Sequence, residues 1–298
     1  MGHVQSSQFI IFADTKSILG EGPVWSSRRN GLYWVDIEGK CLHFKNTSGP
    51  VHSAHFDQKI SAIVETKSDD IIVILAKEIR LYNPVTGISN KLFNVDPEYP
   101  NNRSNDAKCD PKGNLWLGTM DDYMLGTTGK LQVYMPDGNH HTLLENIGIS
   151  NTLAWDEKNN LFYFADSAEK KMYVFDYSYN NDIPVLKNRK IFLSNTDLAE
   201  VPDGSCIDSQ GFIWNAKWGG SRVVRYTPDG AIDHIIEIPT PNVTSCCFGG
   251  KDMKTLFITT AIGNIDHFVE GQSLEAESGG EVFAVELSVS GGRTHYFG

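Results

Sequence analysis

A short run of aromatic and β-branched residues recurs six times at long intervals, and this repetition leaves the chain few possible folds. The runs begin at Leu32, Ile71, Leu115, Leu161, Phe212 and Leu256. Successive runs start 39 to 51 residues apart, with clusters of Gly, Asn, Asp and Pro between them. Helical periodicity is hard to find in the intervening segments. A repeated unit of several strands and this length is typical of a β-propeller blade.

Several runs are followed by a further strand that ends in a turn. Residues 80–82, 131–134 and 223–226 precede turns at 83–87, 136–138 and 228–230. Six such units fill the 298 residues without a linker or a change in composition. The sequence therefore predicts an all-β fold, a single six-bladed β-propeller domain over residues 1–298. The rival architectures, a β-sandwich or two stacked β-domains, do not predict so long a period.

The N-terminal segment at residues 8–13 lies outside the six units. We expect it to pair with the last blade near residues 281–287, which closes the ring and hides the exposed edges of the sheet.

Charge and composition exclude several classes of function. A formal net charge of −11 argues against nucleic acid as a partner, because phosphate binding needs a basic surface. No apolar run approaches the roughly 18 residues that would span a membrane, and the run at residues 9–13 is too short for a signal peptide. We therefore expect a cytoplasmic protein. Five cysteines without a Cys-x-x-Cys pair indicate neither a disulfide framework nor a zinc knuckle.

Three polar residues stand in glycine-marked contexts that favour presentation of a side chain. They are Glu21, Asn151 and Asp203. Two carboxylates and a carboxamide form an all-oxygen set that suits a hard divalent cation. They precede the starts of the first, fourth and fifth runs by 11, 10 and 9 residues. This common phase places them at equivalent, channel-facing positions, although turn chemistry alone could also explain the neighbouring glycines and prolines.

A further polar cluster, Asn-Asn-Arg-Ser-Asn-Asp at residues 101–106, has the same phase relative to Leu115. Its Arg103, Asn105 and Asp106 offer donors and acceptors for a polyhydroxylated ligand or a developing negative charge. A solvated loop is the alternative interpretation. The sequence does not match other catalytic motifs, because it has no Gly-x-Ser-x-Gly elbow, His-Glu-x-x-His, Walker loop or Rossmann fingerprint. The placement of the nine histidines does not favour a histidine-ligated metal.

Five motifs together resemble a known superfamily, that of gluconolactonase, regucalcin (senescence marker protein) and luciferin-regenerating enzyme. The motifs lie at residues 101–106, 115–120, 149–151, 202–204 and 242–250. The likeness extends over essentially the whole chain. Residues 214–220 and 242–244 look closer to bacterial sugar-acid lactonases, including xylonolactonase, than to the animal or insect members.

The resemblance implies a six-bladed propeller with one divalent cation in its channel. By motif match the ligands are Glu21, Asn151 and Asp203. Arg103 and Asn105 match the substrate-binding pair, with Asp106 in support. Ca²⁺, Zn²⁺, Mn²⁺, Mg²⁺ and Fe²⁺ all remain open as the metal.

The activity implied by the resemblance is metal-dependent hydrolysis of a sugar lactone. An aldonolactone such as gluconolactone or xylonolactone would be opened to its aldonic acid, with Asp203 as the candidate general base. The expected partner is therefore a small molecule, and the expected state is a monomer or small homo-oligomer.

Two departures from the family pattern and two alternatives stay open. Thr152 stands where the family usually has glycine, and Asp121, Asp122 and Tyr123 stand where it often has glutamate. One alternative is another calcium-dependent ester hydrolase similar to the paraoxonases. That alternative predicts a histidine in the site or a more apolar channel rim, whereas the motifs at the rim are polar. The other is a non-catalytic propeller that binds cations or proteins.

Overall fold

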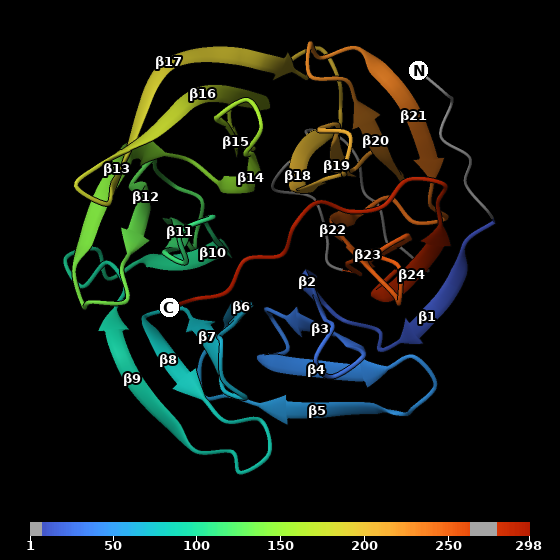
Figure 1. The fold of residues 1–298 in the computed structure, drawn as a ribbon, viewed down its shortest axis with the longest axis horizontal. Coiled ribbons are helices and arrows are strands. Elements are labelled where there is room, and N and C mark those ends of the chain that lie inside the picture. The colour runs from blue at the N-terminus through green and yellow to red at the C-terminus, as the bar shows by residue number, and fades with distance from the viewer. Residues whose placement is uncertain (1–7, 263–278) are drawn as a thin grey trace.

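The computed structural model describes residues 8–262 and 279–298. These residues form 24 strands in six four-stranded antiparallel sheets, arranged as blades around a central axis (Figure 1). The predicted all-β, six-bladed propeller is thereby confirmed. Within the described part of the chain there is no helix that could cross a membrane.

Each blade is built from consecutive strands, except that the last blade takes its outer strand from the N-terminal part of the chain. The strands, blade by blade, are β2 (Gly20–Ser26), β3 (Gly31–Asp36), β4 (Cys41–Asn46) and β5 (Val51–His55); β6 (Ile60–Glu65), β7 (Ile71–Leu75), β8 (Glu78–Tyr82) and β9 (Ser89–Asn94); β10 (Asn102–Cys109), β11 (Leu115–Asp121), β12 (Gly129–Tyr134) and β13 (His140–Ile147); β14 (Ser150–Asp156), β15 (Leu161–Asp166), β16 (Lys171–Asn180) and β17 (Ile183–Ser194); β18 (Val201–Ile207), β19 (Ile213–Trp218), β20 (Arg222–Tyr226) and β21 (Ile232–Glu237); and β22 (Val243–Gly249), β23 (Thr255–Thr260), β24 (Glu281–Glu286) and β1 (Ile10–Asp14).

The repeated apolar runs form the second strand of every blade. Every residue of β3, β7, β11 and β19 is buried, since adjacent blades cover both faces of each sheet. This two-sided burial explains why the runs are nearly continuous in apolar residues and do not alternate. Trp34, Trp116 and Trp214 are fully buried at this level, so the hydrophobic core lies between the blades.

The N-terminal strand lies at the outer edge of the last blade. In antiparallel register, Ile10 is opposite Ala284 and Asp14 is opposite Glu281. Phe12 also packs edge to face on Phe257 of β23, with ring centroids 4.9 Å apart. The N-terminal strand β1 and the last strand β24 therefore share one sheet, which joins the last blade to the start of the chain.

The C-terminal segment crosses the middle of the ring (Figure 1). The Gly291 N–H donates to Met253 O at 2.8 Å, whereas the Phe297 N–H donates to Glu65 O at 2.9 Å. Gly298 donates in turn to Gly113 O at 3.1 Å. The segment therefore links the sixth blade to the second and third across one end of the channel.

The innermost strands β2, β6, β10, β14, β18 and β22 each contact the innermost strands of both neighbouring blades, and so form the channel wall. All six have a register shift against the second strand of their blade. The shifts lie between residues 21 and 24, 60 and 62, 104 and 107, 151 and 154, 202 and 205, and 243 and 245. Such bulges bend a strand and re-aim its side chains. The channel is consequently a ring of six equivalent bulges.

Candidate metal and substrate site

A cavity of about 300 Å³ lies at one end of the channel. Glu21, Asn151, Asp203, Arg103 and Asn105 line it, although the first and the third are 182 positions apart in the chain. Five of the six residues singled out in the sequence therefore come together.

Asp106 does not line this cavity. Its carboxylate nevertheless lies near enough that its negative charge raises the pKa of both Glu21 and Asp203. The structure thus places Asp106 beside the carboxylates and away from the cavity wall.

The bulges explain why these residues converge. Glu21 and Asn151 are the last paired residues before the shifts in β2 and β14, and Asp203 lies inside the shift in β18. Asn105 and Asp106 lie inside the shift in β10. The common phase seen in the sequence corresponds to these bulges, where strand pairing is interrupted and side chains can turn into the channel.

Two aspartates that sequence reasoning missed hold the loops leading to the candidate ligands. The Asp36 carboxylate at the end of β3 accepts the N–H groups of Ile18 and Leu19 at 2.9 and 3.0 Å. The Asp166 carboxylate at the end of β15 accepts those of Gly148 and Ile149, also at 2.9 and 3.0 Å. The sequence did contain a pattern that could have identified them, because the first and fourth apolar runs end in Asp36 and Asp166.

Neighbouring hydrogen bonds fix the amide of Asn151. Its Nδ2 donates to Ser167 Oγ at 2.9 Å, and its Oδ1 accepts from Asn105 Nδ2 at 3.2 Å. Ser167 Oγ in turn donates to Pro202 O at 2.6 Å, next to Asp203. Ser167 also lines the cavity, and no sequence motif had indicated it.

The Arg103 guanidinium is held against the third blade. Its Nε donates to Asp122 Oδ1 at 2.7 Å and its Nη1 to Asn105 Oδ1 at 2.7 Å. Lys59 Nζ also donates to Asp122, at 2.8 Å. Burial acts to raise the pKa of Asp122, but the contacts with Lys59 and Arg103 lower it overall. Asp122, one of the departures from the family pattern, therefore reaches the cavity as a carboxylate paired to Arg103.

The carboxylates of the site are electrostatically unfavourable neighbours. Burial, opposed by the Gly22 N–H and assisted by the charge of Asp106, raises the pKa of Glu21 to about 8. Burial, with the charges of Glu21 and Asp106, raises the pKa of Asp203 far above its usual range. Asp203 Oδ1 and Asp106 Oδ2 are buried without a hydrogen-bond partner among the described residues. Unpartnered buried carboxylate oxygens are costly.

A divalent cation fits this donor set. Carboxylate and amide oxygens are its preferred ligands, and its charge would offset the repulsion between Glu21 and Asp203. Over residues 8–262 and 279–298, no three Asp, Glu, His or Cys side chains gather as a ligand cluster. The fit therefore depends on the amide oxygen of Asn151 together with the two carboxylates.

One side of the cavity is apolar. Leu19, Ile37, Val201 and Trp218, here called the apolar wall, line it. Leu19 packs on the buried cluster of Val201, Trp218 and Ala261. The polar motifs in the sequence had not predicted this wall. The hydrogen-bonding groups of Arg103 and Asp122 lie elsewhere in the lining, on the third blade.

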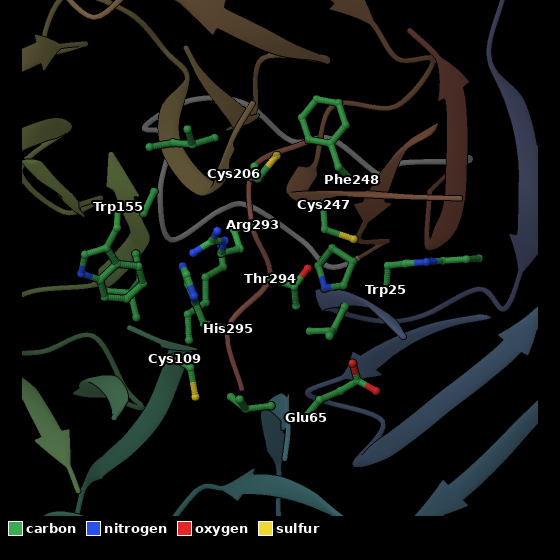
Figure 2. A pocket seen from close by; sticks show the side chains of 18 of the residues that line it. Trp25, Glu65, Cys109, Trp155, Cys206, Cys247, Phe248, Arg293, Thr294 and His295 are labelled. Carbon is green, nitrogen blue, oxygen red and sulfur yellow. The ribbon is translucent and has the colours of Figure 1, made fainter. Parts of the chain in front are cut away.

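A second cavity, of about 180 Å³, lies at the other end of the channel. Trp25 and Trp155 line it from the later halves of β2 and β14, beyond the bulges. Figure 2 shows Arg293, Thr294 and His295 of the C-terminal segment crossing this cavity. None of the six predicted site residues lines it, so the candidate site is at the opposite end.

Comparison with known proteins agrees with this architecture. Residues 19–262 match the family described as SMP-30/Gluconolactonase/LRE-like region. The chain is 32% identical over 279 residues to pentonolactonase XacC of Haloferax volcanii, covering 93% of this chain and 94% of the relative. It is 31% identical over 280 residues to regucalcin of Gallus gallus, covering 92% of each.

A solved structure is similar over the same extent. The calcium-binding protein regucalcin from Agrobacterium tumefaciens superposes with a TM-score of 0.89 at 25% identity, covering 97% of this chain and 96% of that one. The match to the family spans most of the sequence, and the resemblance drawn from the five motifs is confirmed. The chain belongs to the SMP-30/gluconolactonase/LRE-like family.

Proposed function

We propose that this protein is a hydrolase that opens a sugar lactone to its aldonic acid at a divalent-cation site formed by Glu21, Asn151 and Asp203. The observation that carries the proposal is the buried Oδ1 of Asp203, which has no hydrogen-bond partner among the described residues, in a cavity shared with Arg103. A similar protein bears the name pentonolactonase, which supports a small cyclic ester as substrate, and another is described as calcium-binding.

A divalent cation in the site would act as a Lewis acid toward the lactone carbonyl and would lower the pKa of a bound water. Asp203 is the candidate general base. Its Oδ1 has no hydrogen-bond partner among the described residues and can accept a proton from the attacking water.

Arg103 would stabilise the negative charge that develops on the carbonyl oxygen. Its ion pair with Asp122 and its hydrogen bond to Asn105 hold the guanidinium in one place, so little reorganisation is needed during the reaction. Asn105 would orient the lactone ring from the same wall. Asp106 would assist through its charge beside Glu21 and Asp203, since it does not line the cavity.

The proposal is tested with Asp203→Asn, which keeps the shape of the side chain and removes its basicity. We expect hydrolysis of gluconolactone and xylonolactone to fall by about 100-fold or more, with the melting temperature retained. The assay is pH-stat titration of chelated protein resupplied with Ca²⁺, Zn²⁺, Mn²⁺, Mg²⁺ or Fe²⁺. The matched control is Asp137→Asn in an exposed turn.

Near-normal turnover in Asp203→Asn would remove that residue from the mechanism. A wild-type protein that binds a cation and hydrolyses no lactone with any of the five metals would favour the non-catalytic alternative.

A further inference from the structure

Thr152 has a backbone conformation that threonine normally avoids. It lies inside the bulge of β14, directly after Asn151, with φ +54°, and it is fully buried. Of the described residues with positive φ, it is the one β-branched side chain, a class for which this region is strongly disfavoured. Gly22, which follows Glu21 in β2, has nearly the same φ of +52°. Glycine would adopt the backbone conformation at position 152 without strain, as Gly22 does. A threonine there must gain an interaction that offsets its strain.

The hydroxyl of Thr152 provides that compensation. Its Oγ1 donates to the backbone carbonyl of Asp203 at 2.5 Å and shares a hydrogen bond with Ser205 Oγ at 2.9 Å. Asn215 Nδ2 donates to the same carbonyl at 2.9 Å. A residue adjacent to one candidate ligand is thereby bonded to the main chain of another.

Equivalent hydroxyls bridge other pairs of blades. Thr244, in the bulge of β22, donates to Gly20 O at 2.5 Å. Ser61, in the bulge of β6, shares a hydrogen bond with Ser104 Oγ at 2.6 Å. Bulge hydroxyls in alternate blades thus tie each of these blades to the next. Among these three, Thr152 is the one whose bond ends on a candidate ligand itself.

We propose that Thr152 is a positioning residue whose hydroxyl sets the spacing between Asn151 and Asp203 and so determines how tightly the site holds a divalent cation. The inference rests on the proposed cation site. Groups that orient metal ligands commonly contribute about 10- to 100-fold to affinity. The strained left-handed backbone conformation of Thr152 is tolerated because its hydroxyl makes a hydrogen bond that glycine could not make.

The test uses three variants of the full-length protein. Thr152→Ser keeps the hydroxyl, Thr152→Val keeps the shape without the hydroxyl, and Thr152→Gly removes both while suiting the backbone. Affinity for Ca²⁺ and for Mn²⁺ is measured by titration calorimetry after chelation, and the melting temperature is recorded without cation. Ser61→Ala is the matched control, because it removes an equivalent tether that touches no candidate ligand.

We expect Thr152→Ser and Ser61→Ala to bind within about twofold of wild type, and Thr152→Val and Thr152→Gly to bind about tenfold more weakly or worse. If Thr152→Val binds with wild-type affinity and Thr152→Ser binds more weakly, the side-chain shape and not the hydroxyl sets the cation affinity. That result would overturn the inference and leave the proposed function intact. If the valine variant does not fold, wild-type affinity in Thr152→Gly overturns the inference in the same way. A wild-type protein that binds neither cation would instead reject the cation site of the proposed function.

Discussion

At the scale of single residues, the site is dominated by carboxylates whose surroundings favour the protonated form. Asp203 is buried and Glu21 is partly buried. Burial, and after it the negative charge of Glu21, raises the pKa of Asp203. Without a cation, protonation of a carboxylate relieves the repulsion between Glu21 and Asp203. Cation binding and proton binding therefore compete for the same oxygens.

This competition predicts the pH dependence of the cation-free protein. The pKa of Glu21 is raised from 4.5 to about 8, so the folded state holds a proton that the unfolded state has released over that interval. The stabilisation is fully present below pH 4.5 and is lost as the pH rises through 8, with a slope of at most about 1.4 kcal/mol per pH unit. Urea unfolding in chelator between about pH 5 and pH 8 measures it.

Glu21→Gln should flatten this slope relative to wild type, because the amide does not titrate. An identical pH dependence in the two proteins would show that Glu21 is ionised throughout the range. Added Ca²⁺ should stabilise the wild type more at about pH 8 than at about pH 5, since fewer protons must then be displaced.

At the scale of elements, the strands that carry Glu21 and Asn151 depend on the strand next to them. Asp166 at the end of β15 is buried and accepts the N–H groups of Gly148, Ile149 and Ala168. The loop that delivers Asn151 is therefore fixed by the second strand of the same blade. Asp36 has the corresponding place in the first blade.

Asp166→Ala should lower the free energy of unfolding by about 2 to 4 kcal/mol, because three N–H groups lose a charged acceptor and some remain buried. Chemical denaturation measures the loss. The control is Asp137→Ala, whose carboxylate accepts from Asn139 in an exposed turn, and which should cost less than about 1 kcal/mol. Equal losses in the two variants would contradict a special role for the Asp166 contacts.

At the scale of the whole molecule, the cavity combines polar groups of the third blade with the apolar wall. Arg103, Asn105 and Asp122 offer hydrogen bonds to a ligand, whereas the hydrocarbon side chains of Leu19 and Val201 offer none. A substrate hydroxyl packed against Leu19, Ile37 or Val201 would lose its water without a partner. The proposed lactonase should therefore favour lactones that present hydrogen or methyl on that side.

The prediction is tested with matched lactones that differ in one hydroxyl. A 6-deoxyhexonolactone should have a kcat/KM about tenfold above that of its parent hexonolactone, since an unpaired hydroxyl costs about 1 to 3 kcal/mol. Val201→Thr, which is nearly isosteric, should reduce the preference. Hydrolysis of both lactones at equal rates would reject the specificity and leave the lactonase proposal standing.

The propeller and its candidate site residues could be predicted from the chain because they depend on local properties. Each blade needs its own buried second strand, which sets the period of the apolar runs, and the phase of Glu21, Asn151 and Asp203 follows from that period. The partners of these residues came only from strand pairing and from the packing of the blades. Asp122 meets Arg103 within the third blade and Ser167 meets Asn151 within the fourth. The apolar wall forms where Leu19 packs on Val201 and Trp218 of the fifth blade, and Asp106 falls beside the carboxylates because of a bulge.

Contacts between blades join segments that are far apart in the chain, as the hydrogen bond from Phe297 to Glu65 does. Which side chains then face one another depends on strand register and on the closure of the ring, and no local pattern of residues encodes either.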